Sequence, residues 1–298
     1  MSLLLLGITV LAWGLSWYAM RLQVGPVAVE VSIAYRFLLA TALLGLGLWL
    51  SGRWRPVPWR THGVLASLGL CLFGLNYLCM YHATSLVTSG VASVVFTTAT
   101  LFGAFNQWLF FARRPEAAVM AGALLGTTGI VGLFYESVVE LRGDGVVVGL
   151  ALALVGTYVF SLGNVLSVHI SRSVDLPNAV VRAMAWGALG CGGVALLRGQ
   201  AWTLPLEFTY LAALGYLVVI GSVVAFLAYL NLVNRMGAAK AAYATVLFPV
   251  VALTVSTLAG EYRWTTVAFT GLALILLGSA LVFVPGLRRG QVSLPKAP

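Results

Sequence analysis

Polar and aromatic side chains recur at helical spacing within one long apolar stretch, residues 63–82. On a helix, one face of this stretch would carry Phe73, Asn76, Tyr77, Met80 and Tyr81. The Asn76 amide can bond a carboxylate or an ammonium group, and the rings can pack against an apolar side chain. The pattern predicts a pocket for a small amphipathic molecule. The alternative is an Asn76 that hydrogen-bonds a neighbouring helix.

Other apolar stretches add candidates for lining the same pocket. In the first stretch, Trp13 and Trp17 lie one helical turn apart, and the alternative role for them is tight packing between helices. The remaining candidates, grouped by stretch, are Thr100; Tyr158, Ser161 and Asn164; Ser222 and Phe226; and Thr245. Proline bends a helix, and the expected gate residues are His82, Tyr229 and Pro249.

Arg36 is a basic residue deep inside an apolar stretch, residues 27–50. Within a membrane its charge would cost at least about 2.5 kcal/mol unless a partner relieved it. The carboxylate of a ligand is one candidate partner. We expect an internal bond instead, either to Glu30 or to the ends of helices.

Groups for catalysis or metal binding do not come together in this sequence. His82 and His169 each stand near the end of an apolar stretch without a paired acid or serine. Cysteines occur inside apolar stretches, without a Cys-x-x-Cys pair or neighbouring histidines, at Cys71, Cys79 and Cys191. We therefore expect a protein that is not an enzyme and that holds no cofactor or metal.

The composition is that of a protein whose outer surface is covered by lipid. Of 298 residues, 61% are hydrophobic and 8% are charged, with a mean hydropathy of +1.00. Each apolar run is long enough to cross ~30 Å of hydrocarbon. The sequence predicts an all-α membrane protein with ten transmembrane helices, at 3–20, 27–50, 63–82, 89–112, 117–135, 146–170, 178–197, 209–231, 241–259 and 265–284.

The chain has a net charge of +9, and most of its basic residues lie in the connections between apolar stretches. Eleven lie on the side of the two termini and four on the other side. By the positive-inside rule, both termini face the cytoplasm. This asymmetry explains the basic character of the chain, so we expect the bilayer as a partner and no nucleic acid.

An internal repeat divides the chain into halves, at residues 1–140 and 141–298. Gly7 and Gly14 are spaced like Gly149 and Gly156, and the pair Gly122 and Gly129 is spaced like Gly271 and Gly278. Because each half has five spans, the two copies must be inverted in the membrane. Inverted repeats are typical of secondary transporters, whose binding site lies near the midplane.

The chain resembles the EamA-type, ten-helix branch of the drug/metabolite transporter (DMT) superfamily. The residues that carry the resemblance are Trp13-Gly14 with Ser16, Arg36-Phe37, Phe248-Pro249 and Gly260-Glu261. The first half departs from the pattern, with Thr100 and Ala112 where a proline and a glutamate belong. The aromatic-rich helices look most like the aromatic amino-acid exporter (YddG-type) branch.

This resemblance implies a transporter of the cell inner membrane that exports amino acids, with aromatic ones favoured, by alternating access through a central cavity. The alternative cargo is another small metabolite or a lipophilic cationic drug. The oligomeric state stays open, a monomer included. The sequence shows no carboxylate at mid-depth that could carry protons, so we expect transport driven by the concentration of the solute.

Overall fold

The structure is a computed structural model that describes residues 2–111, 144–170, 173–236 and 243–288, together with 120–122, 124–126, 128, 129 and 132. Regular elements in this part of the chain are helical. The first half contains α1 (Ser2–Leu22), α2 (Val29–Leu50), η1 (Trp59–Thr61), α3 (His62–Gly69), η2 (Leu70–Leu75), α4 (Asn76–Leu86), α5 (Ser89–Phe96) and α6 (Ala99–Phe111). The second half contains α8 (Asp144–Ile170), α9 (Leu176–Leu197), α10 (Phe208–Tyr216), η3 (Leu217–Val224), α11 (Ala225–Met236), α13 (Tyr243–Leu258) and α14 (Thr266–Arg288).

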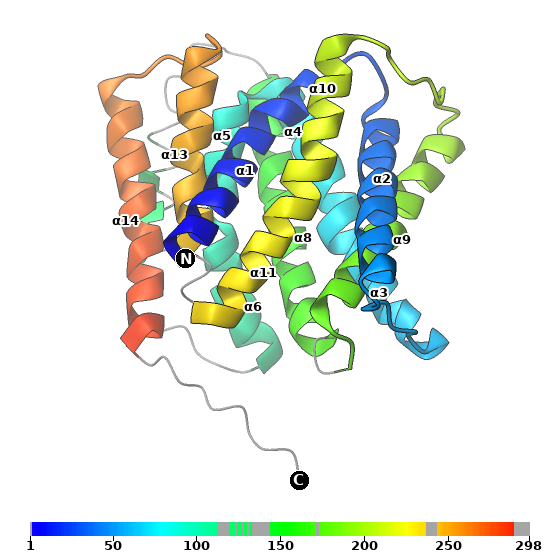
Figure 1. The fold of residues 1–298 in the computed structure, drawn as a ribbon. Coiled ribbons are helices and arrows are strands. Elements are labelled where there is room, and N and C mark those ends of the chain that lie inside the picture. Colours follow the sequence, from blue (N-terminus) through cyan, green and yellow to red (C-terminus); the bar gives the residue numbers. More distant parts are fainter. Residues whose placement is uncertain are drawn as a thin grey trace.

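Seven helical segments of the described chain are long and apolar enough to cross a membrane. Two shorter apolar helices, Leu247–Leu258 and Thr266–Gly278, fall within the predicted spans 241–259 and 265–284. The predicted span 117–135 lies largely outside the described residues. Figure 1 shows the helices side by side in one bundle, with successive connections at opposite ends.

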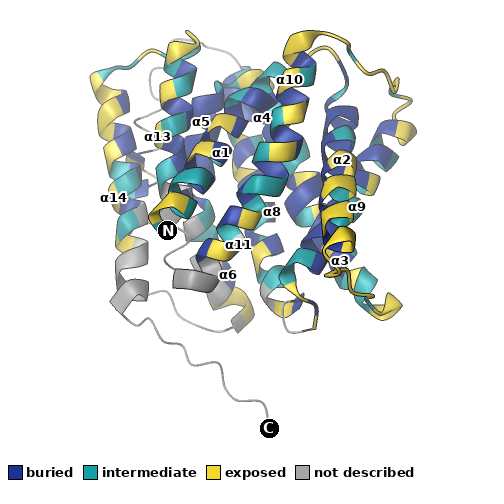
Figure 2. Ribbon diagram, in the orientation of Figure 1, coloured by how far each residue is buried: buried dark blue, intermediate teal, exposed yellow. Residues whose placement is uncertain are grey.

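Apolar side chains cover the outside of this bundle, and polar side chains lie within it. Leu3, Trp49, Leu197 and other large apolar residues are exposed, whereas the buried polar residues include Thr9 and Asn76. Figure 2 shows the buried residues gathered where helices face one another. Lipid offers no hydrogen bonds, so this distribution is the one that a bilayer stabilises.

The predicted helix over 89–112 is interrupted in the structure. Helix α5 ends at Phe96 and α6 begins at Ala99. Between them, the amides of Thr97 and Thr98 bond the carbonyls of Val94 and Val95, three residues back. The two threonine hydroxyls donate to the same carbonyls at 2.7 Å. These local bonds compete with the α-helical pattern and turn the chain.

Two other long helices contain a π-helical segment at matching places. η2 follows α3 and leads into α4, and η3 follows α10 and leads into α11. Each π-helix starts four residues before a glycine, Gly74 in η2 and Gly221 in η3. Such segments widen a helix locally and are frequent at functional sites.

Helix α1 packs between α11 and α13, while α8 packs against α4 and α6. Helices α2 and α9 form another extensive contact. In the interior, η3 contacts both α1 and α2, and η2 packs against α8 and α9. The candidate site is built from η2, η3, α1 and α2 and the helices that continue them.

Candidate functional site

Arg36 is the most unusual buried residue of the bundle, with only 1% of its surface exposed. Its Nε donates to Ser222 Oγ at 3.2 Å, and its Nη2 donates to the Tyr77 hydroxyl at 3.4 Å. The guanidinium carbon lies 4.5 Å from the centre of the Tyr77 ring, a cation–π contact. Helix α2 therefore projects a fixed positive charge toward η3 and α4.

Arg36 makes internal bonds, as expected, but Glu30 as its partner is wrong. Glu30 accepts a hydrogen bond from Arg198 and forms an ion pair with it. Among the described residues, Arg36 is bonded to neutral hydroxyls only, and its Nη1 has no hydrogen-bond partner. The sequence could not reveal this, because the ends of α2 and α9 meet only in the folded bundle.

A continuous series of aromatic rings leads away from Arg36. The Phe37 ring lies 4.9 Å from Tyr77 and 5.2 Å from Phe73. Phe73 in turn lies 5.5 Å from Phe226, and Phe226 lies 5.5 Å from Trp13. Trp13 continues the series to Tyr229 at 5.1 Å. Four of the predicted binding residues, Trp13, Phe73, Tyr77 and Phe226, therefore belong to one aromatic wall beside the charge.

Small and polar groups approach Arg36 from α1 and η3. A Cβ atom added to Gly221 would lie 2.6 Å from Ser16 Oγ and 3.7 Å from Arg36 Nη2. Only glycine leaves room for this approach. The Ser16 hydroxyl and the Tyr216 hydroxyl both donate to the carbonyl of Ala12, at 2.6 and 2.9 Å. Gly221 thus lies between the Ser16 hydroxyl and the guanidinium of Arg36.

Trp17 belongs to a second aromatic group. Its ring lies 5.5 Å from Phe96 and 6.0 Å from Phe248, and Phe96 lies 4.7 Å from Phe160. Pro249, predicted as a gate residue, is buried within α13 next to Phe248. This group joins α1, α5, α8 and α13.

The predicted face of helix α8 does not meet Arg36. Ser161 Oγ accepts a hydrogen bond from Asn106 Nδ2 at 2.9 Å, and the Tyr158 ring lies 5.4 Å from Phe102. Both contacts are with α6. Asn164 is exposed on the surface of α8. Asn76 donates from Nδ2 to the carbonyl of Leu72, one turn back along the chain, and its buried Oδ1 has no partner among the described groups.

Other predicted residues have simpler positions. His82, expected at a gate, is partly buried on α4. The side chains of Thr100 and Thr245 lie outside the described residues. Sequence reasoning missed Gln23, whose Oε1 accepts from the Tyr81 hydroxyl at 2.7 Å, and the Ser32–Tyr210 hydroxyl pair at 2.9 Å. The spacing of Ser32 and Arg36, one turn apart on α2, was the available signal for the second pair.

A cluster around Glu261 joins three helices at the end of the bundle away from α3. Glu261 Oε2 accepts from Ser89 at 2.8 Å and from Ser256 at 3.1 Å, and its Oε1 lies 3.7 Å from Arg21 Nε. Gly260 has a φ of 74°, a conformation that favours glycine and turns the chain at the end of α13. We call Arg21, Ser89, Ser256 and Glu261 the Glu261 latch.

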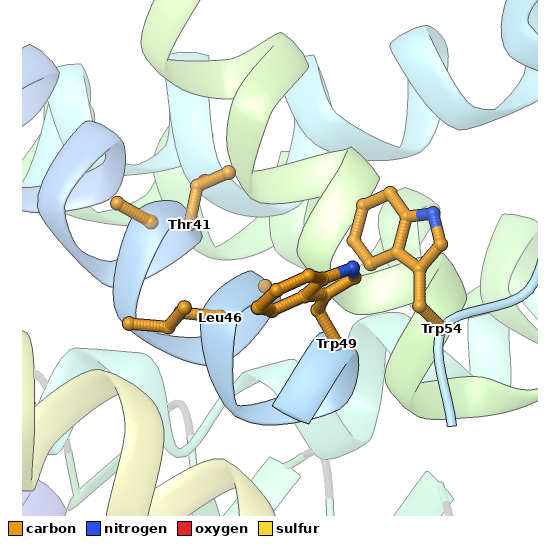
Figure 3. A pocket seen from close by; sticks show the side chains of 6 residues that line it. Thr41, Leu46, Trp49 and Trp54 are labelled. Atoms are coloured by element: carbon orange, nitrogen blue, oxygen red, sulfur yellow. The ribbon is translucent and has the colours of Figure 1, made fainter. Parts of the chain in front are cut away.

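At the opposite end, the connection after α2 is held against α9. Arg182 donates to the carbonyl of Arg55, and Asn178 donates to the carbonyl of Arg53. The same segment borders a groove of about 400 Å³, lined by Thr41, Ala42, Gly45, Leu46, Trp49 and Trp54 (Figure 3). Both tryptophans are exposed on the outside of the bundle. This groove is therefore separate from the Arg36 site.

Comparison with known proteins adds a family to this geometry. The EamA-like transporter family matches residues 1–135 and 147–284. The chain is 27% identical over 271 residues to the uncharacterized inner membrane transporter YedA of Escherichia coli K12, covering 91% of this chain and 86% of YedA. It is 23% identical over 282 residues to protein PagO of Salmonella typhimurium, covering 92% and 90%.

An uncharacterized transporter of Archaeoglobus fulgidus is 27% identical over 244 residues, which cover 80% of this chain and 83% of that protein. One crystal structure of a protein superimposes with a TM-score of 0.66 at 21% identity, covering 97% of this chain and 98% of the other. That likeness concerns the fold alone.

Proposed function

Because this chain belongs to the EamA-like transporter family and is a multi-pass inner-membrane protein, we propose that it exports amino acids, with aromatic ones favoured. The observation that carries this proposal is the Arg36 site, where a buried cation adjoins an aromatic wall. A pocket that is mostly apolar with one fixed polar group suits a small amphipathic solute.

The two halves, residues 1–140 and 141–298, act in this proposal as inverted repeats of five spans each. Two features support the duplication. The family matches the chain twice, once in each half, and a π-helix precedes a glycine by four residues in both α3–α4 and α10–α11. Rocking of the halves around the Arg36 site would open it to each side in turn.

Both termini face the cytoplasm in this arrangement, since the side of the termini carries eleven basic residues against four. The Glu261 latch then lies on the outer side of the membrane. It ties α1 to α5 and α13, and we propose that it closes the outer entrance.

A lipophilic cationic drug is the alternative cargo, and other small metabolites are a further one. A cation would need a buried carboxylate. Among the described residues, the charge that lies beside the aromatic wall is the positive charge of Arg36. The geometry therefore supports a cargo with a negative group over a cationic one.

Tyr77→Ala tests the proposed function. We expect the uptake of phenylalanine into liposomes to fall at least about tenfold, since Tyr77 holds the Arg36 guanidinium in place by a hydrogen bond and by a desolvated cation–π contact worth about 2 kcal/mol. Phe208→Ala is the matched control, because Phe208 is an exposed ring at the start of α10. Wild-type uptake by folded Tyr77→Ala protein would show that this wall does not line the pathway.

A further inference from the structure

Among the described residues, the hydrogen bonds of Arg36 reach no anion, and its charge is otherwise in contact with the rings of Phe37 and Tyr77. A guanidinium has five N–H donors and carries its charge at any physiological pH. Here two donors reach neutral hydroxyls, on Ser222 and Tyr77, and Nη1 reaches no partner among the described groups. An unpaired charge inside a bundle is costly and marks a functional site by default.

The described acidic side chains are committed elsewhere or lie at the rim. Glu30 pairs with Arg198, and Glu261 is held in its latch. Asp175 bonds Asn178 at the start of α9, and Glu207 is exposed at the start of α10. These acids therefore do not bond the guanidinium of Arg36, and an anionic ligand could do so.

We infer that Arg36 binds the carboxylate of the transported solute, and that the site takes carboxylates with an apolar or aromatic side chain whether or not they carry an amino group. This rests on the proposed function. A carboxylate can accept from Nη1, and the apolar part of the solute can pack beside Phe73, Phe226 and Trp13 when the bundle opens around the site.

The single charge decides the class of anion. A phosphate carries close to two negative charges and would need a second cation beside it. Arg182, the other buried arginine of the described part of the chain, instead bonds Asn178 and the carbonyl of Arg55 at the opposite end of α9 from Arg198. An ammonium group would need an acid, and the acids described above lie elsewhere. The carboxylate is thus the group that the site recognises.

The test measures binding to the purified full-length protein by calorimetry with three probes. Phenylalanine and 3-phenylpropionate both have the carboxylate, and 2-phenylethylamine lacks it. We expect the two acids to bind with affinities within about threefold of each other, and the amine at least about tenfold more weakly. These comparisons use wild-type protein only, so they do not depend on a variant that folds.

Variants then locate the effect at Arg36. Arg36→Met should weaken the binding of both acids at least about tenfold. Arg36→Lys should have an affinity between those of wild-type and Arg36→Met protein, because lysine keeps the charge and loses the planar guanidinium. Arg60→Met is the matched control, since Arg60 is exposed in η1. Equal binding of amine and acids, no binding of either acid, or full affinity in folded Arg36→Met protein would overturn the inference.

The two proposals fail in different ways. If 3-phenylpropionate binds through Arg36 and phenylalanine is not transported, the amino-acid cargo is wrong and the carboxylate site stands. If wild-type protein transports phenylalanine and Arg36→Met protein transports it equally well, the carboxylate site is wrong and the transport function stands.

Discussion

Replacing Glu261 with alanine should raise the equilibrium constant for opening of the outer side of the protein by about two orders of magnitude. Glu261 accepts two hydrogen bonds, from Ser89 and Ser256, and each bond to a charged group contributes about 1.5–3 kcal/mol. The Arg21 pair adds little, because Arg21 is 40% exposed. A loss of about 3 kcal/mol corresponds to about a hundredfold shift.

The readout is a cysteine at Ser93, in a chain whose three native cysteines are replaced. Ser93 is buried in α5 one turn from Ser89, so it should react with an impermeant thiol reagent only when the outer side opens. We expect Glu261→Ala to raise the labelling rate from outside the cell by at least about tenfold.

Glu207→Ala is the control for this experiment, because it removes an exposed acid at the start of α10. Its labelling rate should equal that of the parent. An unchanged rate in folded Glu261→Ala protein would contradict the latch. Labelling of Ser93→Cys only from the cytoplasmic side would contradict the proposed orientation as well.

Gly69→Ala should lower the free energy of unfolding by about 3 kcal/mol, the upper part of the usual range for overpacking. A Cβ atom at Gly69 would lie 2.2 Å from the carbonyl oxygen of Ala183 and 2.9 Å from Trp186 Cβ. These atoms belong to backbone or lie next to it, so α3 and α9 would have to separate. That contact also leads directly into η2, which carries Phe73.

The control is the same substitution at Gly47, where an added Cβ would have no neighbour within 4 Å. Gly47→Ala should leave stability unchanged or raise it by up to about 1 kcal/mol, because alanine favours the helix. The measurement is the midpoint of thermal denaturation in detergent. Equal midpoints for the two variants would show that α3 and α9 can adjust to each other.

Helical spacing and the absence of hydrogen bonds in lipid predicted the inward faces of several helices, although Asn164 on α8 is exposed. They placed Trp13, Phe73, Tyr77 and Phe226 in the interior, and the structure joins these residues in one wall. Such an argument works because each helix must hide its own polar groups, whatever its neighbours are.

The spacing of residues along one helix does not say which other helix it meets at a given depth. The sequence therefore suggested Glu30 for Arg36, although Arg198 takes Glu30 in the fold. Tyr158 and Ser161 satisfied the same inward rule but face α6.

Helical spacing also could not predict local changes in the backbone, because it assumes regular α-helices. The turn at Thr97 and Thr98 and the two π-helices alter the periodicity on which such a reading depends. A π-helix shifts every later side chain around the helix axis. Ser222, which bonds the guanidinium of Arg36, lies within η3.

We propose that this protein carries aromatic amino acids through the Arg36 site, driven by their concentration difference across the membrane. The most direct test is the uptake of labelled phenylalanine into liposomes that contain the purified protein, with no ion gradient. We expect saturable uptake faster than that of liposomes without protein. In a second experiment, substrate starts at the same concentration on both sides, and an imposed pH gradient should leave its distribution unchanged. Uptake no faster than in empty liposomes would contradict the proposal, as would phenylalanine accumulation that a protonophore abolishes.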